Sequence, residues 1–263
     1  MTIDEAAIAA VLRRLDAKPG PMLVHSDLRR CLGLRGRSRD EKLETLLRGL
    51  ENAVGDGPLL VPAYTYSYCR GEDFDPARSP SMVGAFGEWL RGQPGSRRTT
   101  DPIYSIVVRG TLPPAWEQRL FSTGDSDCFG PDSGFAYLRE ADAQILFFGV
   151  AATANTFVHH LEQILGVGYR YLKDFTGRVM TPTGATPTRA SMFVRDLASD
   201  VEVYFVPLVE ALLREGGAKA GQIEGGPALV LTSACAVERC VRREIAANPD
   251  FLLRRGHPRA LAA

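Results

Sequence analysis

The chain has 263 residues, of which 45% are apolar and 24% charged, a composition typical of globular proteins. Basic and acidic residues balance at 31 each, so the chain lacks the basic excess on which nucleic-acid binding depends. No apolar run approaches the roughly 20 residues of a membrane span. The N-terminal stretch MTIDEAAIAAVLRRLD predicts an amphipathic helix rather than a signal peptide, and the five scattered cysteines form neither a disulfide framework nor a CxxC pattern. These features predict a cytoplasmic protein that binds neither nucleic acid nor membrane.

Apolar runs of strand length alternate with amphipathic segments along the chain. Strands are predicted at 22–25, 59–64, 103–108, 145–150 and 228–234. Helices are predicted near 4–16, 41–54, 81–92, 132–140, 155–166, 202–215 and 235–247. Because the strands are apolar on both faces and are separated by helices, they predict a sheet that is covered on each side. We therefore expect a single three-layer α/β/α domain over residues 1–263, built around a mixed central sheet.

The first predicted strand leads directly into Ser26 and Asp27 and then into a basic cluster. This cluster consists of Arg29, Arg30, Arg35, Arg37 and Arg39. The Ser26 hydroxyl and the amides that follow it could form an anion site for a phosphate-bearing ligand, and a plain turn with solvated arginines is the alternative. No GxGxxG motif or Walker lysine accompanies the stretch, so a dinucleotide or a nucleoside triphosphate is not indicated. Two long polar segments, 66–80 and 93–102, contain Pro and Gly and are of the kind that forms sites.

The predicted helix at 155–166 contains two of the four histidines of the chain. His159 and Glu162 are three residues apart and therefore share one helix face. The helix follows a predicted strand, and ligand crevices of open α/β sheets form at the carboxyl ends of strands. An imidazole oriented by a carboxylate is suited to general-base catalysis near neutral pH, whereas a solvent-facing pair without a role is the alternative. Thr153 or Asn155 is expected to cap the helix.

Metal-dependent and covalent mechanisms have little support in the sequence. An HxxE pair supplies at most two ligands, HExxH is absent, and His25 and His257 have no metal-like spacing, so no metal is predicted. A GxSxG motif is also absent. Cys69 and Cys128 lie in loop-like stretches, where a cysteine is more often inert than nucleophilic.

Six stretches follow one another along the chain: LVHSDLRRCLGL, LLVPAYTYSYCRGEDFDPARSPSMVGAF, RRTTDPIYSIVVRG, CFGPDSGFAYL, ILFFGVAATANTFVHHLEQILGVGYR and GQIEGGPALVLTSACAVERCVRREIAANPDFLL. Together they span nearly the whole chain. In content and order they resemble the antibiotic N-acetyltransferase family, the coenzyme A-dependent enzymes that include the aminoglycoside 3-N-acetyltransferases. The resemblance implies a single α/β/α domain of the family's own topology, acetyl-CoA as the acyl donor, and an amine as the acceptor.

The resemblance also implies roles for individual residues. The family pattern T-x-x-H-x-x-E falls on Thr156, His159 and Glu162, so His159 is the expected general base and Glu162 its catalytic partner. The family's H-S-S stretch contacts the phosphates of the donor, and this chain departs from it at Asp27, because a carboxylate repels phosphate unless it points elsewhere. The expected donor-binding residues are His25, Ser26, Asp27, Arg98, Ser105 and Thr156.

Two further departures concern the acceptor. Members that act on aminoglycosides commonly have R-S-x-H-P-x-x-S where this chain has residues 98–105, and Asp101 replaces the histidine. Tyr66 stands where several of those enzymes have an acidic residue. These differences leave open whether the acceptor is an aminoglycoside, a related amino sugar, or a nucleotide-linked or surface-polysaccharide amino sugar. The residues expected to hold a cationic acceptor are Tyr66, Glu72, Asp73, Asp75 and Asp101.

The chemistry of amine acylation can be considered without the resemblance. An amine attacks a thioester only in its free form, so the reaction needs a base and hydrogen-bond donors aimed at the developing oxyanion. His159 fits the first task, and amides at the start of its helix could serve the second. Direct transfer is expected because no activated cysteine or serine is evident. A non-catalytic binding member of the family and a hydrolase in which His159 activates water are the alternatives. The expected partners are an acyl-CoA and a small-molecule amine, and the sequence leaves open whether the chain forms a homodimer.

Overall fold

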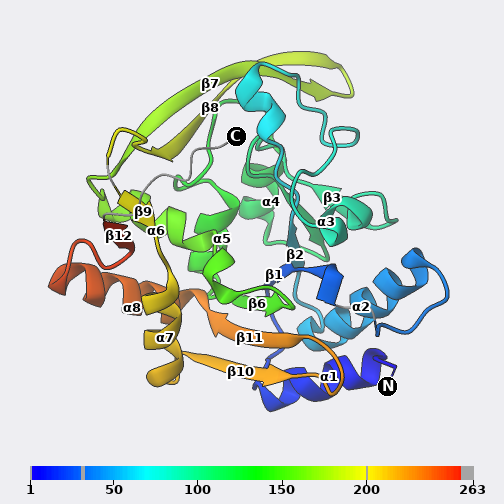
Figure 1. The fold of residues 1–263 in the computed structure, drawn as a ribbon. Coiled ribbons are helices and arrows are strands. Elements are labelled where there is room, and N and C mark those ends of the chain that lie inside the picture. The colour runs from blue at the N-terminus through cyan, green and yellow to red at the C-terminus, as the bar shows by residue number, and fades with distance from the viewer. Residues whose placement is uncertain (1, 31–32, 200, 256–263) are drawn as a thin grey trace, which may run out of the picture.

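A mixed β-sheet forms the centre of the computed structural model, which describes residues 2–30, 33–199 and 201–255 (Figure 1). Cys31, His257 and the side chain of Arg30 lie outside the described residues. Within them, the sheet has seven strands in the order β10–β11–β6–β1–β2–β4–β3. β1 runs parallel to its neighbours β2 and β6, and the other neighbouring pairs are antiparallel. The strands are β1 (Met22–Ser26), β2 (Leu59–Pro62), β3 (Ser96–Arg98), β4 (Ile106–Arg109), β6 (Gln144–Phe148), β10 (Ala218–Gln222) and β11 (Ala228–Ser233).

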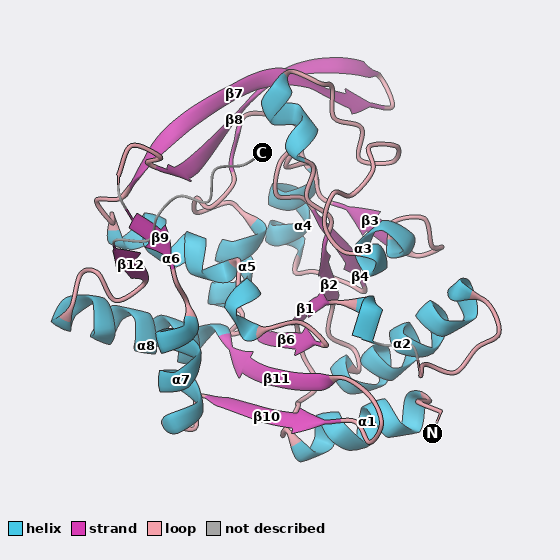
Figure 2. Ribbon diagram, viewed as in Figure 1, coloured by secondary structure: helices cyan, strands magenta, loops and turns pink. Residues whose placement is uncertain are grey.

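Helices cover both faces of this sheet (Figure 2). On one face, Val24 of β1 and Leu146 of β6 share a core with α1 (Glu5–Arg14), α2 (Arg39–Val54) and α3 (Ala85–Leu90). On the other face, the preceding residues of these strands, Leu23 and Ile145, join a second core. The helices of the second core are α4 (Pro114–Phe121), α5 (Gly134–Glu140), α6 (Phe157–Leu165), α7 (Val206–Arg214) and α8 (Ala234–Ala247). Because successive side chains of a strand point to opposite faces, strands that are apolar throughout supply both cores, which confirms the predicted three-layer α/β/α arrangement.

The main feature that the sequence analysis missed is a long hairpin of β7 (Arg170–Thr181) and β8 (Gly184–Arg195). With β5 (Ser126–Asp127) it forms a separate small sheet in the order β5–β8–β7, and it arches along the outside of the molecule at the top of Figure 1. Its first strand is exposed at most positions from 171 to 178, so it lacks the apolar runs on which the strand predictions relied. β9 (Val201–Val203) and β12 (Leu253–Arg255) form a further pair, and α4 was also missed.

Three short 3-10 helices complete the secondary structure of the described chain, namely η1 (Leu28–Arg30), η2 (Tyr66–Arg70) and η3 (Ala152–Ala154). The first follows the carboxyl end of β1, the second lies in a predicted site-forming loop, and the third leads from β6 to α6. Among the helices of the described residues, none has the length and apolar character needed to cross a bilayer.

Candidate active site

The helix α6 starts where the chain leaves the central sheet at the carboxyl end of β6. Asn155 caps it in part, because its Oδ1 accepts a hydrogen bond from the amide of Phe157 at 3.2 Å. The amides of Val158 and His159 donate to the carbonyls of Asn155 and Thr156. These first amides are therefore engaged within the helix start, which gives no support to the prediction that they serve as oxyanion donors.

His159 and Glu162 form a direct pair on one face of α6. The distance between His159 Nδ1 and Glu162 Oε2 is 2.6 Å. Because an ionised carboxylate can only accept hydrogen bonds, Nδ1 carries the proton and Nε2 keeps a free lone pair. The His159 side chain is 19% exposed, and its ring lies against Phe129 and Phe205 at centroid distances of 5.5 and 5.9 Å. The imidazole thus has the tautomer and the access that a general base requires.

Glu162 is fully buried and is held by three other side chains. Tyr169 Oη donates to its Oε1 at 2.8 Å, and Arg170 Nε forms an ion pair with its Oε2 at 2.9 Å. Burial alone would raise the pKa of Glu162, but the hydrogen bond and charge interaction with His159, the positive charge of Arg170 and the hydrogen bond from Tyr169 together outweigh burial and lower it. The carboxylate therefore stays ionised at neutral pH and fixes the orientation of His159.

The adjacent His160 has a different environment. It is 3% exposed, and its Nδ1 lies 2.7 Å from the carbonyl oxygen of Phe129, to which it donates. Burial lowers its pKa, so the ring is neutral at pH 7. His160 thus anchors the loop that contains Phe129, one of the rings that contact His159.

A cavity of about 340 Å³ opens at the carboxyl ends of β1 and β2, and we call it the strand-end cavity. His25, Ser26, Tyr64, Tyr66 and Thr156 are among the residues that line it. Thr156 lies one helical turn before His159, and its Oγ1 is 2.7 Å from Tyr64 Oη. Within such a pair one hydroxyl donates to the other, so one hydroxyl hydrogen remains free for a ligand.

His25 lines the strand-end cavity and stacks on Phe147 at a centroid distance of 5.3 Å. It is 8% exposed, and its buried Nε2 has no hydrogen-bond partner. Burial lowers the pKa of His25 to about 4, so the ring is neutral at pH 7. A buried polar atom without a partner costs free energy, and a polar group of a ligand in the cavity would remove that cost.

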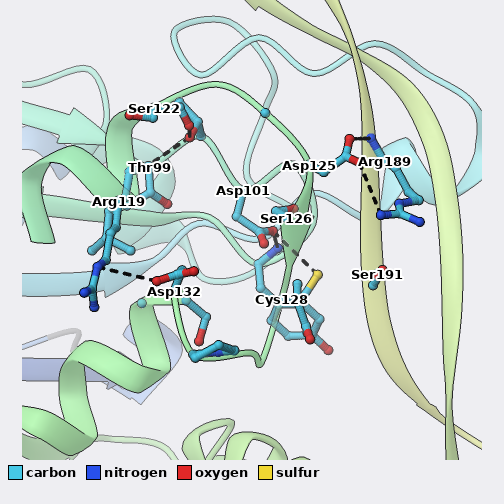
Figure 3. A pocket seen from close by; sticks show the side chains of 18 residues that line it. Thr99, Asp101, Arg119, Ser122, Asp125, Ser126, Cys128, Asp132, Arg189 and Ser191 are labelled. Atoms are coloured by element: carbon cyan, nitrogen blue, oxygen red, sulfur yellow. Dashed lines mark hydrogen bonds and ion pairs between the residues drawn. The ribbon is translucent and has the colours of Figure 1, made fainter.

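A second cavity, of about 370 Å³, lies between the loop before α5 and strand β8, and we call it the aspartate cavity (Figure 3). Four aspartates and two arginines line it, namely Asp101, Asp125, Asp127, Asp132, Arg119 and Arg189. The arginines pair with Asp132 and Asp125 at 3.4 and 3.3 Å. Acidic side chains thus outnumber basic ones, which suits a cationic ligand.

His159 lines neither cavity, but contacts lead from it to residues of both. Thr156, which immediately precedes α6, lines the strand-end cavity. On the other side, Phe129 packs against His159 and also against Tyr104, with 4.6 Å between the centroids of the Phe129 and Tyr104 rings. Tyr104 lines the aspartate cavity. Each cavity is thus linked to His159 through one or two intervening residues.

Comparison with known proteins identifies the family. The family model described as aminoglycoside 3-N-acetyltransferase matches residues 23–243, most of the chain. The chain belongs to this family.

Aminoglycoside N(3)-acetyltransferase IV of a Salmonella species is 30% identical over 168 residues, an alignment that spans 63% of this chain and 60% of that protein. A structure described as AAC-IIIb in a binary complex with CoASH is 25% identical and superposes with a TM-score of 0.77, over 98% of this chain and 99% of that one. The structure of aminoglycoside acetyltransferase AAC(3)-Xa is 21% identical with a TM-score of 0.78, over 95% and 94% of the two chains. The fold is therefore that of the aminoglycoside 3-N-acetyltransferases, which are acyltransferases.

Within this family frame, the predicted donor residues fall into two groups. His25, Ser26 and Thr156 line the strand-end cavity. Asp27 turns its carboxylate toward Arg29, whose Nη2 lies 2.8 Å from Asp27 Oδ2, so its charge is directed to the exposed arginine rather than left unpaired. This contact removes the objection that Asp27 raised against a phosphate-bearing donor.

The predicted donor contacts of Arg98 and Ser105 do not fit their placement. Arg98 is 6% exposed, and its Nε donates to Ser105 Oγ at 2.9 Å. Its other guanidinium nitrogens donate to the carbonyls of Ser79 and Ala63 and to Thr65 Oγ1. Because these bonds engage all three guanidinium nitrogens, Arg98 holds the loops around the strand-end cavity together, and its placement does not support contact with a ligand.

The predicted acceptor residues are also divided. Asp101 lines the aspartate cavity, where its Oδ1 accepts the amides of Ile103 and Tyr104 at 2.9 and 2.6 Å. Burial raises its pKa, although those amides act in the opposite direction. The dashed line to Cys128 in Figure 3 marks a 3.7 Å contact with the thiol.

Tyr66 lines the strand-end cavity rather than the aspartate cavity. Glu72 and Asp75 line neither of the two. Glu72 pairs with Arg70 at 3.2 Å, and Asp75 Oδ1 caps its own loop through the amide of Ala77 at 2.8 Å. Their predicted contact with the acceptor is therefore not supported by their placement.

Tyr169 and Arg170 were missed by the sequence analysis. They follow the glycine-containing turn that ends α6, and no motif in GVGYRY marks them. Their proximity to Glu162 in sequence was the one available signal. Among the described residues, no cluster of three or more histidine, cysteine, aspartate or glutamate side chains that could hold a metal ion was found.

Proposed function

We propose that this chain is an acetyl-CoA-dependent N-acetyltransferase that acylates an amino group of an aminoglycoside or a related amino sugar. The observation that carries the proposal is the His159–Glu162 pair, 2.6 Å apart, which is linked to one cavity through Thr156 and to the other through Phe129 and Tyr104. Family membership supports the acyl transfer, and the CoASH complex of the related AAC-IIIb supports the donor.

The strand-end cavity is proposed to hold the thioester end of the donor. Its lining is largely apolar, as the binding of an extended acyl carrier requires, and it offers the unpartnered Nε2 of His25 together with Ser26 and Thr156. The donor supplies an acyl group activated as a thioester. These residues bind and orient it, and the free hydroxyl hydrogen of the Thr156–Tyr64 pair is placed to stabilise negative charge on an oxygen.

His159 is proposed to take the proton from the attacking amine. As the nitrogen–carbon bond forms and the carbon–sulfur bond breaks, the proton moves from the amine to Nε2 of His159, and it is then available to the departing thiolate. Glu162 stabilises the imidazolium that forms, because its carboxylate accepts the Nδ1 hydrogen. General-base help of this kind contributes about 10²–10⁴-fold to the rate.

The aspartate cavity is proposed to bind the cationic acceptor. Within the described residues, Asp101 and Asp127 are the carboxylates of this cavity that form no ion pair with an arginine. Asp127 is held by Gln163 of α6 at 2.6 Å, which links the acceptor cavity to the helix of the base. Charge–charge attraction of this kind favours an acceptor with several amino groups over a simple monoamine.

A thiol-release assay with acetyl-CoA tests this function. Aminoglycosides, nucleotide-linked amino sugars and simple alkylamines are compared, with the His159→Ala variant as the matched control. The proposal expects thiol release that depends on a polyamine sugar and is matched by an N-acetylated product. Thiol release without any acceptor would indicate a hydrolase. Thermal stabilisation by acetyl-CoA without release for any amine would indicate a binding protein, and either result would overturn the proposal.

A further inference from the structure

The start of the β7–β8 hairpin reaches into the buried side of the His159–Glu162 pair. Gly166 ends α6 in a left-handed conformation with φ 63° and ψ 43°, and the amide of Val167 donates back to the carbonyl of Glu162. This turn reverses the chain so that Tyr169 and Arg170 face the carboxylate of Glu162. A hairpin that looks peripheral in the fold therefore contributes two side chains to the centre of the site.

Arg170 is fixed in this position from both sides. Its side chain is 8% exposed, and its Nη1 donates to the carbonyl oxygen of Phe193 on β8 at 3.0 Å. Its Nε lies 2.9 Å from Glu162 Oε2, and its Nη2 lies 3.1 Å from His159 Nδ1. The guanidinium is thus in contact with both members of the pair.

The consequence is electrostatic. A buried carboxylate without a cation next to it would hold a neighbouring imidazole in its protonated form, because the imidazolium would be its counter-charge. A protonated imidazole has no lone pair with which to accept a proton. Arg170 supplies the counter-charge instead, and its positive Nη2 next to Nδ1 opposes a second positive charge on the ring.

We infer that Arg170 is a positioning residue that neutralises Glu162 and so keeps His159 uncharged and able to act as a base. The inference rests on the proposed role of His159. The groups that face this imidazole in the described structure are Glu162 from α6, Arg170 from β7, and the uncharged rings of Phe129 and Phe205. The balance between one carboxylate and one guanidinium therefore sets the charge of the ring.

The test is an NMR titration of the His159 ring in the wild type and in Arg170→Gln. The chain has only four histidines, and the signal is assigned with His159→Asn. The midpoint of the titration is expected to rise by at least about one pH unit in Arg170→Gln, since a neighbouring charge shifts a titration by one to three units. The acidic limb of the kcat/KM profile is expected to move upward with it. An unchanged midpoint would overturn the inference.

Two further variants separate charge from packing. Lys173→Gln removes one positive charge from an exposed position of the same strand and is expected to leave the midpoint unchanged. Arg170→Ala leaves a space beside Glu162, and added guanidinium ion is expected to return its midpoint toward the wild-type value, which also covers the case in which the glutamine variant does not fold. A failure of guanidinium to move the midpoint would count against the inference. Because the titration does not depend on turnover, its result is distinguishable from a failure of the proposed enzymatic function.

Discussion

The buried ion pair of Glu162 and Arg170 makes a quantitative prediction about stability. The two side chains are 0% and 8% exposed, so loss of Glu162 leaves the Arg170 charge in the interior without its counter-charge, and loss of Arg170 leaves His159 as the remaining group that can balance Glu162. Breaking such a pair typically costs about 3–5 kcal/mol. Glu162→Gln is expected to fall in this range and Arg170→Gln at its lower end, because His159 can take up a proton beside Glu162; most folded domains with about 5–15 kcal/mol of stability survive such a loss.

The double variant distinguishes the ion pair from general loss of packing. Removing both charges leaves no unpaired ion, so Glu162→Gln with Arg170→Gln is expected to be more stable than the sum of the single effects predicts, by about 2 kcal/mol. Urea unfolding at pH 7 measures this, provided that the slope with denaturant is the same in all variants.

A matched control lies farther along the same hairpin. Arg178 Nε is 3.0 Å from Asp73 Oδ1, but these side chains are 59% and 35% exposed. Their coupling is expected to be under about 1 kcal/mol, because water screens the pair. The effects of Glu162→Gln and Arg170→Gln on the free energy of unfolding could instead add within about 0.5 kcal/mol, or the coupling energy could be the same as for Asp73 and Arg178. Either result would refute the argument that Glu162 depends on Arg170 for its charge.

Other consequences follow from single side chains. Burial lowers the pKa of His25 to about 4, whereas an unfolded histidine has a pKa of about 6.5, so the unfolded chain takes up the proton first as the pH falls. The free energy of unfolding is therefore expected to fall by up to about 3 kcal/mol between these two pH values. His25→Gln should flatten this part of the urea-unfolding profile and weaken acetyl-CoA binding; an unchanged slope would argue against the buried neutral ring. A Cβ at Gly87 would lie 2.1 Å from the Pro62 carbonyl oxygen, so Gly87→Ala is expected to lower the melting temperature by several degrees, whereas Gly124→Ala, with nothing within 4 Å, should change it little. Asp101→Asn keeps the oxygen that accepts the two amides but removes the charge, and it should raise the acceptor KM about tenfold without changing acetyl-CoA affinity; an unaltered KM would exclude Asp101 from acceptor binding.

Five strands of the central sheet could be predicted from their apolar runs, whereas the more exposed β3 and β10 were missed. β1, β2, β4, β6 and β11 contain uninterrupted apolar runs, and such runs are distinctive in a sequence. β7 could not be found in the same way. Its residues, such as Lys173 and Asp174, are mostly exposed, and they form neither an apolar run nor a regular apolar face. Its position is set by pairing with β8 and not by a local pattern.

The candidate site was predictable only where its residues are neighbours in sequence. His159 and Glu162 share a helix face, and a spacing of three places them together in any helix. The burial of Arg98 depends on loops more than 15 residues away, including Ala63 and Ser79, so its role as a structural tie was not visible. Arg170 needs the turn at Gly166 before it can reach Glu162, which sequence alone does not specify.

The most direct test of the account is the turnover of His159→Ala with the best acceptor from the thiol-release assay, measured together with acetyl-CoA affinity. The account predicts that kcat falls by at least about 10²-fold while the Kd for acetyl-CoA stays within about twofold of the wild type, because the imidazole moves a proton and does not hold the donor. A kcat equal to that of the wild type, from a correctly folded variant, would contradict the assignment of His159 as the base.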